Sequence, residues 1–170
     1  MDNKEINIFT ENIYPDWELD EYEVIQTTRK IVSHYVSQLS DTSCLKGFDY
    51  SVLSFDILFC DSVKTHQINR EYRQKDYPAD IITFAIFADD DSKFILDEEI
   101  NLGEIILALD KVREEAKKHD VSDNYELYFL IAHGILHLLG FDHQTEEDYN
   151  FVVDVQTKTL EYIGIGKNDE

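Results

Sequence analysis

The chain has 170 residues, of which 43% are hydrophobic and only two are proline, and this composition excludes a disordered or fibrous protein. Its formal net charge of −21 makes a broad nucleic-acid-binding surface unexpected, because proteins usually bind phosphate groups through a basic patch. The length fits one domain over residues 1–170.

The N-terminal residues 1–17 are acidic and polar, so they lack the positive and apolar regions of a signal peptide. The sequence also has no apolar run of about eighteen residues, the length that indicates a membrane-spanning helix. Its two cysteines, Cys44 and Cys60, lie in no metal-binding spacing, and we expect both to be buried free thiols. These features predict a cytoplasmic protein.

In the first half of the chain, the spacing of apolar residues predicts two strands and two helices. Asp61 is the expected N-cap of the second helix, which should end in the polar run before Pro78. In chain order we expect a strand at 6–9, a helix at 19–39, a strand at 51–60 and a helix through 63–72.

In the second half we expect a strand at 80–87, a charged connection at 88–97, a strand at 104–109 and a helix through 112–119. Asp110 should cap that helix. Ser122 should cap the next one, which is apolar on nearly every face and therefore central, and Gly140 should end it. Thr145 should open a last helix. The predicted fold is α+β (α/β-like), with one small mixed sheet covered by about five helices.

Three of the six histidines lie within the eleven residues from His133 to His143. His133 and His137 are four residues apart on the predicted central helix, so their rings share one face. Gly140 lets the chain reverse, so that His143 can return as a third nitrogen ligand. Imidazoles suit first-row ions, and three protein ligands leave a position for water, as in catalytic sites. We predict one divalent ion there, Zn²⁺ first and Ni²⁺ or another first-row ion as alternatives.

Such an ion lowers the pKa of its bound water to about 7 and so supplies a hydroxide nucleophile. The predicted metal site therefore indicates a hydrolase. The spacing also resembles the H-E-x-x-H-x-x-G-x-x-H pattern of metzincin proteases, but Gly134 stands where those enzymes have a glutamate base. Met1 is the only methionine, so a Met-turn is excluded. A metzincin-like protease is therefore the less favoured enzyme. The other histidines are interpreted as ordinary side chains: His34, His66 and His119.

Residues 133–143 have the form HGxLHLxGxDH, which resembles the signature of the YbeY endoribonucleases, a family that acts in ribosomal RNA maturation. Residues 68–84 and 102–105 resemble two further blocks of that family. The resemblance implies a zinc-type ion on the three histidines and hydrolysis of single-stranded RNA, in maturation of the small-subunit RNA 3′ end and in ribosome quality control. It also implies small-subunit ribosomal proteins and a ribosome-associated GTPase as partners, with neither DNA nor a membrane.

Arg73 matches the functional arginine of that family, and with His133 it is the predicted catalytic pair. A guanidinium suits phosphate binding and charge stabilisation, and Arg70 and Lys75 are predicted to assist. Asp142 is expected either to orient a ligand imidazole or to shape its turn. Four positions depart from the family pattern, which makes this a divergent member: Ala79, Thr83, Ala85 and Glu104.

Two questions stay open at the level of sequence. The nucleophile is either metal-bound water or the 2′-hydroxyl of the RNA. A hypothesis of another class is a non-catalytic ribosome-assembly factor, in which a fourth ligand such as Asp142 or His66 completes a structural metal site and the acidic surface docks basic ribosomal proteins.

Overall fold

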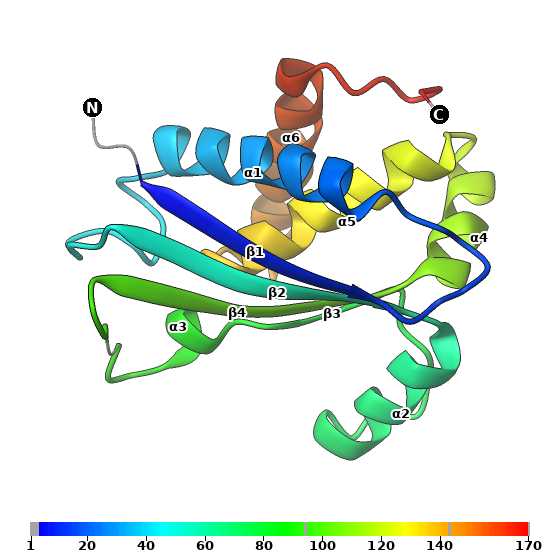
Figure 1. Ribbon diagram of the computed structural model, residues 1–170, viewed down its shortest axis with the longest axis horizontal. Coiled ribbons are helices and arrows are strands. Elements are labelled where there is room, and N and C mark those ends of the chain that lie inside the picture. Colours follow the sequence, from blue (N-terminus) through cyan, green and yellow to red (C-terminus); the bar gives the residue numbers. More distant parts are fainter. Residues whose placement is uncertain (1–3, 94, 143, 170) are drawn as a thin grey trace.

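The structure is a computed structural model that describes residues 4–93, 95–142 and 144–169 (Figure 1). Its helices and strands follow one another in this order: β1 (Glu5–Asn12), α1 (Glu21–Gln38), β2 (Val52–Cys60), α2 (Ser62–Tyr72), β3 (Ile81–Phe84), α3 (Ile86–Asp89), β4 (Glu99–Ala108), α4 (Leu109–His119), α5 (Asp123–Leu138) and α6 (Glu146–Ile163).

The sheet is mixed, with strand order β1-β2-β4-β3. β1, β2 and β4 run parallel, whereas β3 is antiparallel to β4. Residues of β2 alternate between the two faces, and Leu53, Phe55 and Ile57 are almost completely buried on the face toward the helical layer. The expected α+β fold with a small mixed sheet is confirmed.

Helices α1, α5 and α6 lie on one side of the sheet, and α2 lies on the other (Figure 1). α2 contributes Ile68 to a small second cluster with Cys60, Ile82 and Ile106. The larger core lies between the sheet and α5, where Leu127, Ile131, Ile135 and Leu138 have no exposed surface. α5 is therefore the central buried helix that its apolar sequence predicts.

Local signals at the ends of α5 explain its bounds. The Ser122 side chain accepts a hydrogen bond from the backbone N–H of Tyr125 at 3.0 Å, which caps the helix start. After Leu138 the chain turns through Gly140, whose φ of +95° is a left-handed conformation that favours glycine. Gly134 packs against the sheet, because a Cβ there would lie 3.0 Å from the Cδ1 atoms of Ile81 and Ile105.

Three local predictions are wrong. The expected strand at 80–87 ends at Phe84 and is followed by the single turn α3. Asp110 does not cap α4, which begins at Leu109; its carboxylate instead accepts a hydrogen bond from the backbone N–H of Ser62 at 2.8 Å, at the start of α2. Cys44 is only half-buried, while Cys60 is buried, and both are free thiols.

β4 also begins earlier than expected, at Glu99, and contains an irregularity at Gly103. The φ of Gly103 is +132°, and a Cβ on it would lie 1.9 Å from the backbone oxygen of Phe84. Only glycine allows β3 to approach β4 this closely. Within the described ranges, no helix is both long and apolar enough to cross a lipid bilayer.

Candidate active site

The rings of His133 and His137 lie side by side on α5. Their Nε2 atoms are 3.0 Å apart, and the ring centroids are 4.6 Å apart. Both side chains are half-buried, in contrast to the fully buried residues around them. Two imidazole nitrogens this close share either a proton or a cation, because two lone pairs facing each other would repel. The four-residue spacing on one helix thus produces a converging pair of imidazole nitrogens, as two ligands of one ion would require.

Gln156 of α6 orients one of these rings. Its amide nitrogen donates a hydrogen bond to the backbone oxygen of Phe129 at 3.0 Å, so its Oε1 atom faces His133. Oε1 lies 3.1 Å from Nδ1 of His133 and accepts the proton of that nitrogen. The Nε2 atom of His133 is then left with its lone pair toward His137. Gln156 is completely buried, which holds this arrangement in place.

These donors fit a first-row divalent ion. For comparison, two nitrogens about 2.0 Å from one tetrahedral ion lie about 3.3 Å apart, close to the observed separation. His143, the third predicted ligand, lies outside the described residues. Among the residues that are described, no group of three or more His, Cys, Asp or Glu side chains is arranged to hold an ion. His133 and His137 are therefore the part of the predicted site that the structure brings together.

The two fourth ligands considered for a structural site lie in different surroundings. Asp142 is exposed in the turn after α5, next to the undescribed His143. His66 lies on α2, and its Nε2 atom is 2.8 Å from a carboxylate oxygen of Asp76. The His66 ring therefore already has Asp76 as a partner, and His66 does not line the cavity beside His133.

Two adjoining cavities lie near His133. The first, which we call the histidine cavity, has a volume of about 500 Å³ and is lined by His133, Gln156 and Glu126 among others. The second, the arginine cavity, has a volume of about 410 Å³ and includes Arg73 and Lys111. Asp80 and Ile81 line both cavities. The two cavities therefore share a wall, and the cations of the arginine cavity, together with Glu115, lie next to the cavity that His133 lines.

The three cations predicted to bind phosphate have different surroundings. Arg73 ends α2, where one of its guanidinium nitrogens lies 3.4 Å from the side-chain oxygen of the buried Asn69. Lys75 lines the arginine cavity together with Arg73. Arg70 does not line this cavity, because its guanidinium pairs with Asp76 at 3.1 Å on the exposed surface of α2. Lys111 lines the cavity although sequence reasoning did not select it.

Two carboxylates of the histidine cavity have raised pKa values. Burial raises the pKa of Asp80, whose side chain accepts a hydrogen bond from the backbone N–H of Ile81 at 2.8 Å. Burial also raises the pKa of Glu126, which is 3% exposed. His119 lies 2.9 Å from Glu126, and this hydrogen bond raises the pKa of the imidazole. Sequence reasoning gave His119 no role, yet it lines the same cavity as His133.

A family model described as Endoribonuclease YbeY matches residues 16–164. The Endoribonuclease YbeY of Bacillus pumilus is 43% identical over 107 residues, which cover 61% of this chain and 67% of that protein. The Endoribonuclease YbeY of Oceanobacillus iheyensis is 35% identical over 133 residues, which cover 76% and 86%. The chain belongs to the YbeY family. The solution structure of TM1509 from Thermotoga maritima, with a TM-score of 0.56 and 20% identity over 93% of this chain and 88% of that one, has the same fold.

Two of the three sequence blocks that resemble YbeY proteins contribute residues to this site. Residues 68–84 supply Arg73 and Asp80 to the cavity walls, and the block that begins at His133 supplies the paired imidazoles of His133 and His137. The third block, residues 102–105, contains the glycine that lets β3 approach β4. In this YbeY chain, Gly134 faces the isoleucines of the sheet, so a glutamate base at that position would collide with the core. The glutamate base of a metzincin-like mechanism therefore cannot be accommodated at position 134.

Sequence reasoning missed Gln156, Asp80, Glu126 and Lys111. Gln156 carried a usable signal, because it is an amide on the inner face of α6, where Val152 and Leu160 are apolar and buried. A buried amide at such a position must have hydrogen-bond partners. Glu126 lies seven residues before His133 on α5, so helix spacing alone places both in the wall of the histidine cavity. Asp80 and Lys111 are ordinary charged positions in the sequence, and only the packing of the YbeY fold brings them to the cavities.

Proposed function

We propose that this protein is a metal-dependent endoribonuclease that cleaves single-stranded RNA and acts in ribosomal RNA maturation, at the 3′ end of the small-subunit RNA, and in ribosome quality control. Membership of the YbeY family supports the reaction class. The observation that carries the proposal is the 3.0 Å approach of the two Nε2 atoms beside a cavity that adjoins Arg73.

The proposed metal ligands are His133, His137 and His143, and Zn²⁺ is the proposed ion. Imidazole nitrogens in a half-buried position suit zinc, with Ni²⁺ or another first-row ion as the alternative. When bound, such an ion would supply Lewis-acid activation of a water molecule or of the phosphate. Gln156 maintains the tautomer in which Nε2 of His133 is the ligand atom. Elemental analysis of the purified protein tests the identity of the ion.

The protein side chains perform the remaining steps. Arg73 binds a non-bridging phosphate oxygen and stabilises the negative charge that develops there, because a guanidinium can donate two parallel hydrogen bonds. Lys75 and Lys111 add positive charge along the same wall. Asp80 lies between the two cavities, and the rise in its pKa brings it nearer to the range in which a carboxylate accepts a proton efficiently. We propose that the Asp80 carboxylate accepts the proton of the attacking water.

A cleavage assay on single-stranded RNA with the metal-loaded protein tests this mechanism. We expect His137→Ala to abolish cleavage and Arg73→Ala to reduce kcat about 100-fold. Arg70→Ala is the matched control, because this arginine lies on the same helix but outside the arginine cavity, and we expect it to retain activity. Asp80→Asn should lower kcat about 100-fold with unchanged metal content. Equal activity in all variants would show that a contaminating nuclease is measured.

Partners and location are proposed on separate grounds. The net charge of −21 suits docking to basic small-subunit ribosomal proteins, and the family resemblance adds a ribosome-associated GTPase. A cytoplasmic location follows from this role. Co-sedimentation with small ribosomal subunits at increasing salt tests the docking, because an electrostatic contact weakens as ionic strength rises.

A further inference from the structure

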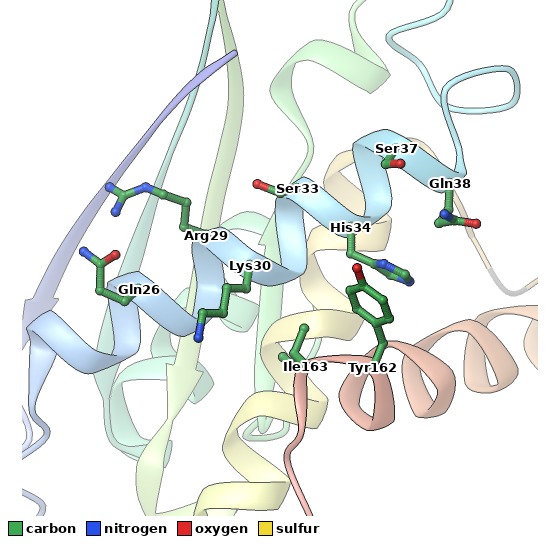
Figure 2. Close-up of a pocket in the computed structure, with 9 residues that line it drawn as sticks. All are labelled: Gln26, Arg29, Lys30, Ser33, His34, Ser37, Gln38, Tyr162 and Ile163. Atoms are coloured by element: carbon green, nitrogen blue, oxygen red, sulfur yellow. The ribbon is translucent and has the colours of Figure 1, made fainter. Parts of the chain in front are cut away.

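A separate cavity of about 800 Å³ lies between α1 and the C-terminal end of α6 (Figure 2). We call it the α1–α6 pocket and define it by Arg29, Lys30, His34 and Tyr162. None of its lining residues also lines the histidine cavity or the arginine cavity. It is therefore distinct from the candidate active site.

The α1–α6 pocket is basic although the protein is strongly acidic. The chain has 36 Asp and Glu against 15 Lys and Arg, yet this pocket is lined by Arg29 and Lys30 and by no acidic residue. Neither cation forms an ion pair with a carboxylate of the described residues. Arg29 donates through Nε to the backbone oxygen of Ile6 at 3.2 Å, and Lys30 is exposed. This local charge favours an anionic ligand.

An aromatic pair stands beside these cations. The rings of His34 and Tyr162 are stacked, with centroids 4.3 Å apart and an angle of 26° between their planes, and Figure 2 shows them at the junction of the two helices. Lys30 is four residues before His34 and so lies on the same face of α1. Tyr162 is 74% exposed, which leaves much of its ring surface open to a third ring. Aromatic side chains of this kind provide stacking platforms for nucleic-acid bases.

Short polar side chains complete the pocket wall. Ser33, Ser37 and Gln38 offer hydroxyl and amide groups that can both donate and accept hydrogen bonds. Such groups can contact the edge of an unpaired base. The pocket thus offers one kind of group for each part of a nucleotide. Its cations suit the phosphate, its exposed ring suits the base face, and its polar side chains suit the base edge.

We propose that the α1–α6 pocket binds a nucleotide of single-stranded RNA outside the active site, with the base stacked on Tyr162 and the phosphate near Lys30 and Arg29. The choice of RNA rests on the proposed function. α6 links the two sites, since Gln156 lines the histidine cavity and Tyr162 lies six residues further, about 9 Å along the helix axis. An RNA that occupies both sites gains affinity that a short RNA lacks.

Titration with 5′-AMP, followed by NMR, tests the pocket without any cleavage. We expect the ring resonances of His34 and Tyr162 to shift in the wild type, and the shifts of His34 to be lost in the double variant Lys30→Gln/Tyr162→Ala. The matched control is Lys46→Gln/Tyr22→Ala, which removes an exposed lysine and a tyrosine that is also 74% exposed, both outside the pocket. Equal shifts of His34 with inorganic phosphate alone would overturn the nucleotide assignment, because stacking would then contribute nothing.

Cleavage of two RNAs tests the role of the pocket in catalysis. For an unstructured RNA of about 24 nucleotides, we expect the pocket double variant to raise KM about tenfold with unchanged kcat, while an RNA of about 6 nucleotides is cleaved as by the wild type. An unchanged KM for the longer RNA would overturn the proposal. Failure of the proposed function can be distinguished from failure of the pocket proposal. If the wild type cleaves no RNA but 5′-AMP still binds through Tyr162, the proposed function is wrong and nucleotide binding by the pocket is supported.

Discussion

The side-chain oxygen of Gln156 lies 3.1 Å from Nδ1 of His133 and links α6 to the imidazole pair on α5. A hydrogen bond to the nitrogen opposite the ligand atom fixes the tautomer and the direction of a metal-binding histidine. Gln156 is therefore a positioning residue that acts through His133. Its effect should appear first in metal affinity and only then in the rate of cleavage.

Replacing Gln156 with leucine tests this relationship. We expect Gln156→Leu to lower zinc affinity about 10- to 100-fold, because Nδ1 of His133 loses its acceptor. Gln156→Glu keeps an acceptor toward His133 and should retain more of the affinity than the leucine variant. Competition with a chromogenic chelator measures both values, and circular dichroism checks that both variants are folded. Equal zinc affinity in the leucine variant and the wild type would contradict the positioning role.

Gly103 provides a test of the fold. We expect Gly103→Ala to destabilise the protein by about 3 kcal/mol or more, because its Cβ would overlap the backbone oxygen of Phe84. Gly47→Ala is the matched control, since Gly47 also has a positive φ of +83° but its Cβ would meet nothing within 4 Å. That control should lose only about 1 kcal/mol. Urea denaturation measures both, and similar losses would show that strain at φ, rather than contact with β3, limits position 103.

The same glycine explains why part of the fold was not predictable. Residues 80–87 have the apolar sequence of a strand, but the β3 ladder ends where Phe84 pairs with Glu104, next to Gly103 on β4. The chain then turns into α3. Conversely, Glu99 and Asn101 look polar for a strand and join β4 because β2 offers them backbone partners. Pairing between distant segments decides where both strands begin and end, and the local sequence pattern carries no information about this pairing.

Helix starts were more accessible to sequence reasoning, because a cap depends on neighbouring residues alone. Asp61, Ser122 and Thr145 each accept a hydrogen bond from a backbone N–H in the first turn that follows. The imidazole pair was equally local, since both residues lie on one helix. Gln156 and Asp80 reach the site only because α6 and β3 pack against α5, and this packing cannot be read from the spacing of residues.

The hydrogen-bonded pair of the buried Glu126 and the largely exposed His119 predicts a pH dependence of stability. Burial raises the folded-state pKa of Glu126, and hydrogen bonding to Glu126 raises that of His119. A raised pKa means that the folded state binds the proton more tightly, so both groups stabilise the protein at low pH and lose that contribution as the pH rises through their folded pKa values. The loss begins above the ordinary pKa of 4.5 for Glu126 and above the ordinary pKa of 6.5 for His119, so we expect wild-type stability to fall in these two ranges as the pH rises.

Glu126→Gln separates this effect from general titration. Glutamine still accepts the hydrogen bond from Nδ1 of His119 but carries no charge, so the stability of this variant should depend less on pH and should equal or exceed that of the wild type at pH 8. Chemical denaturation at several pH values measures the difference. Parallel pH profiles for the two proteins would show that the pair does not control this part of the stability curve.

The choice of nucleophile can be decided on the substrate. We propose that water attacks the phosphate, because Asp80 lies on the wall shared by the histidine and arginine cavities, where it can accept the proton of a water molecule. An RNA with a single 2′-deoxy sugar at the cleavage position should then be cut at a rate within about threefold of the normal RNA, since the 2′-hydroxyl takes no part in bond formation. A second RNA with the 2′-deoxy sugar two positions away controls for changes in binding. Loss of cleavage only when the modification is at the cleaved bond would instead assign the attack to the 2′-hydroxyl, and Asp80 would then have to accept its proton from the RNA.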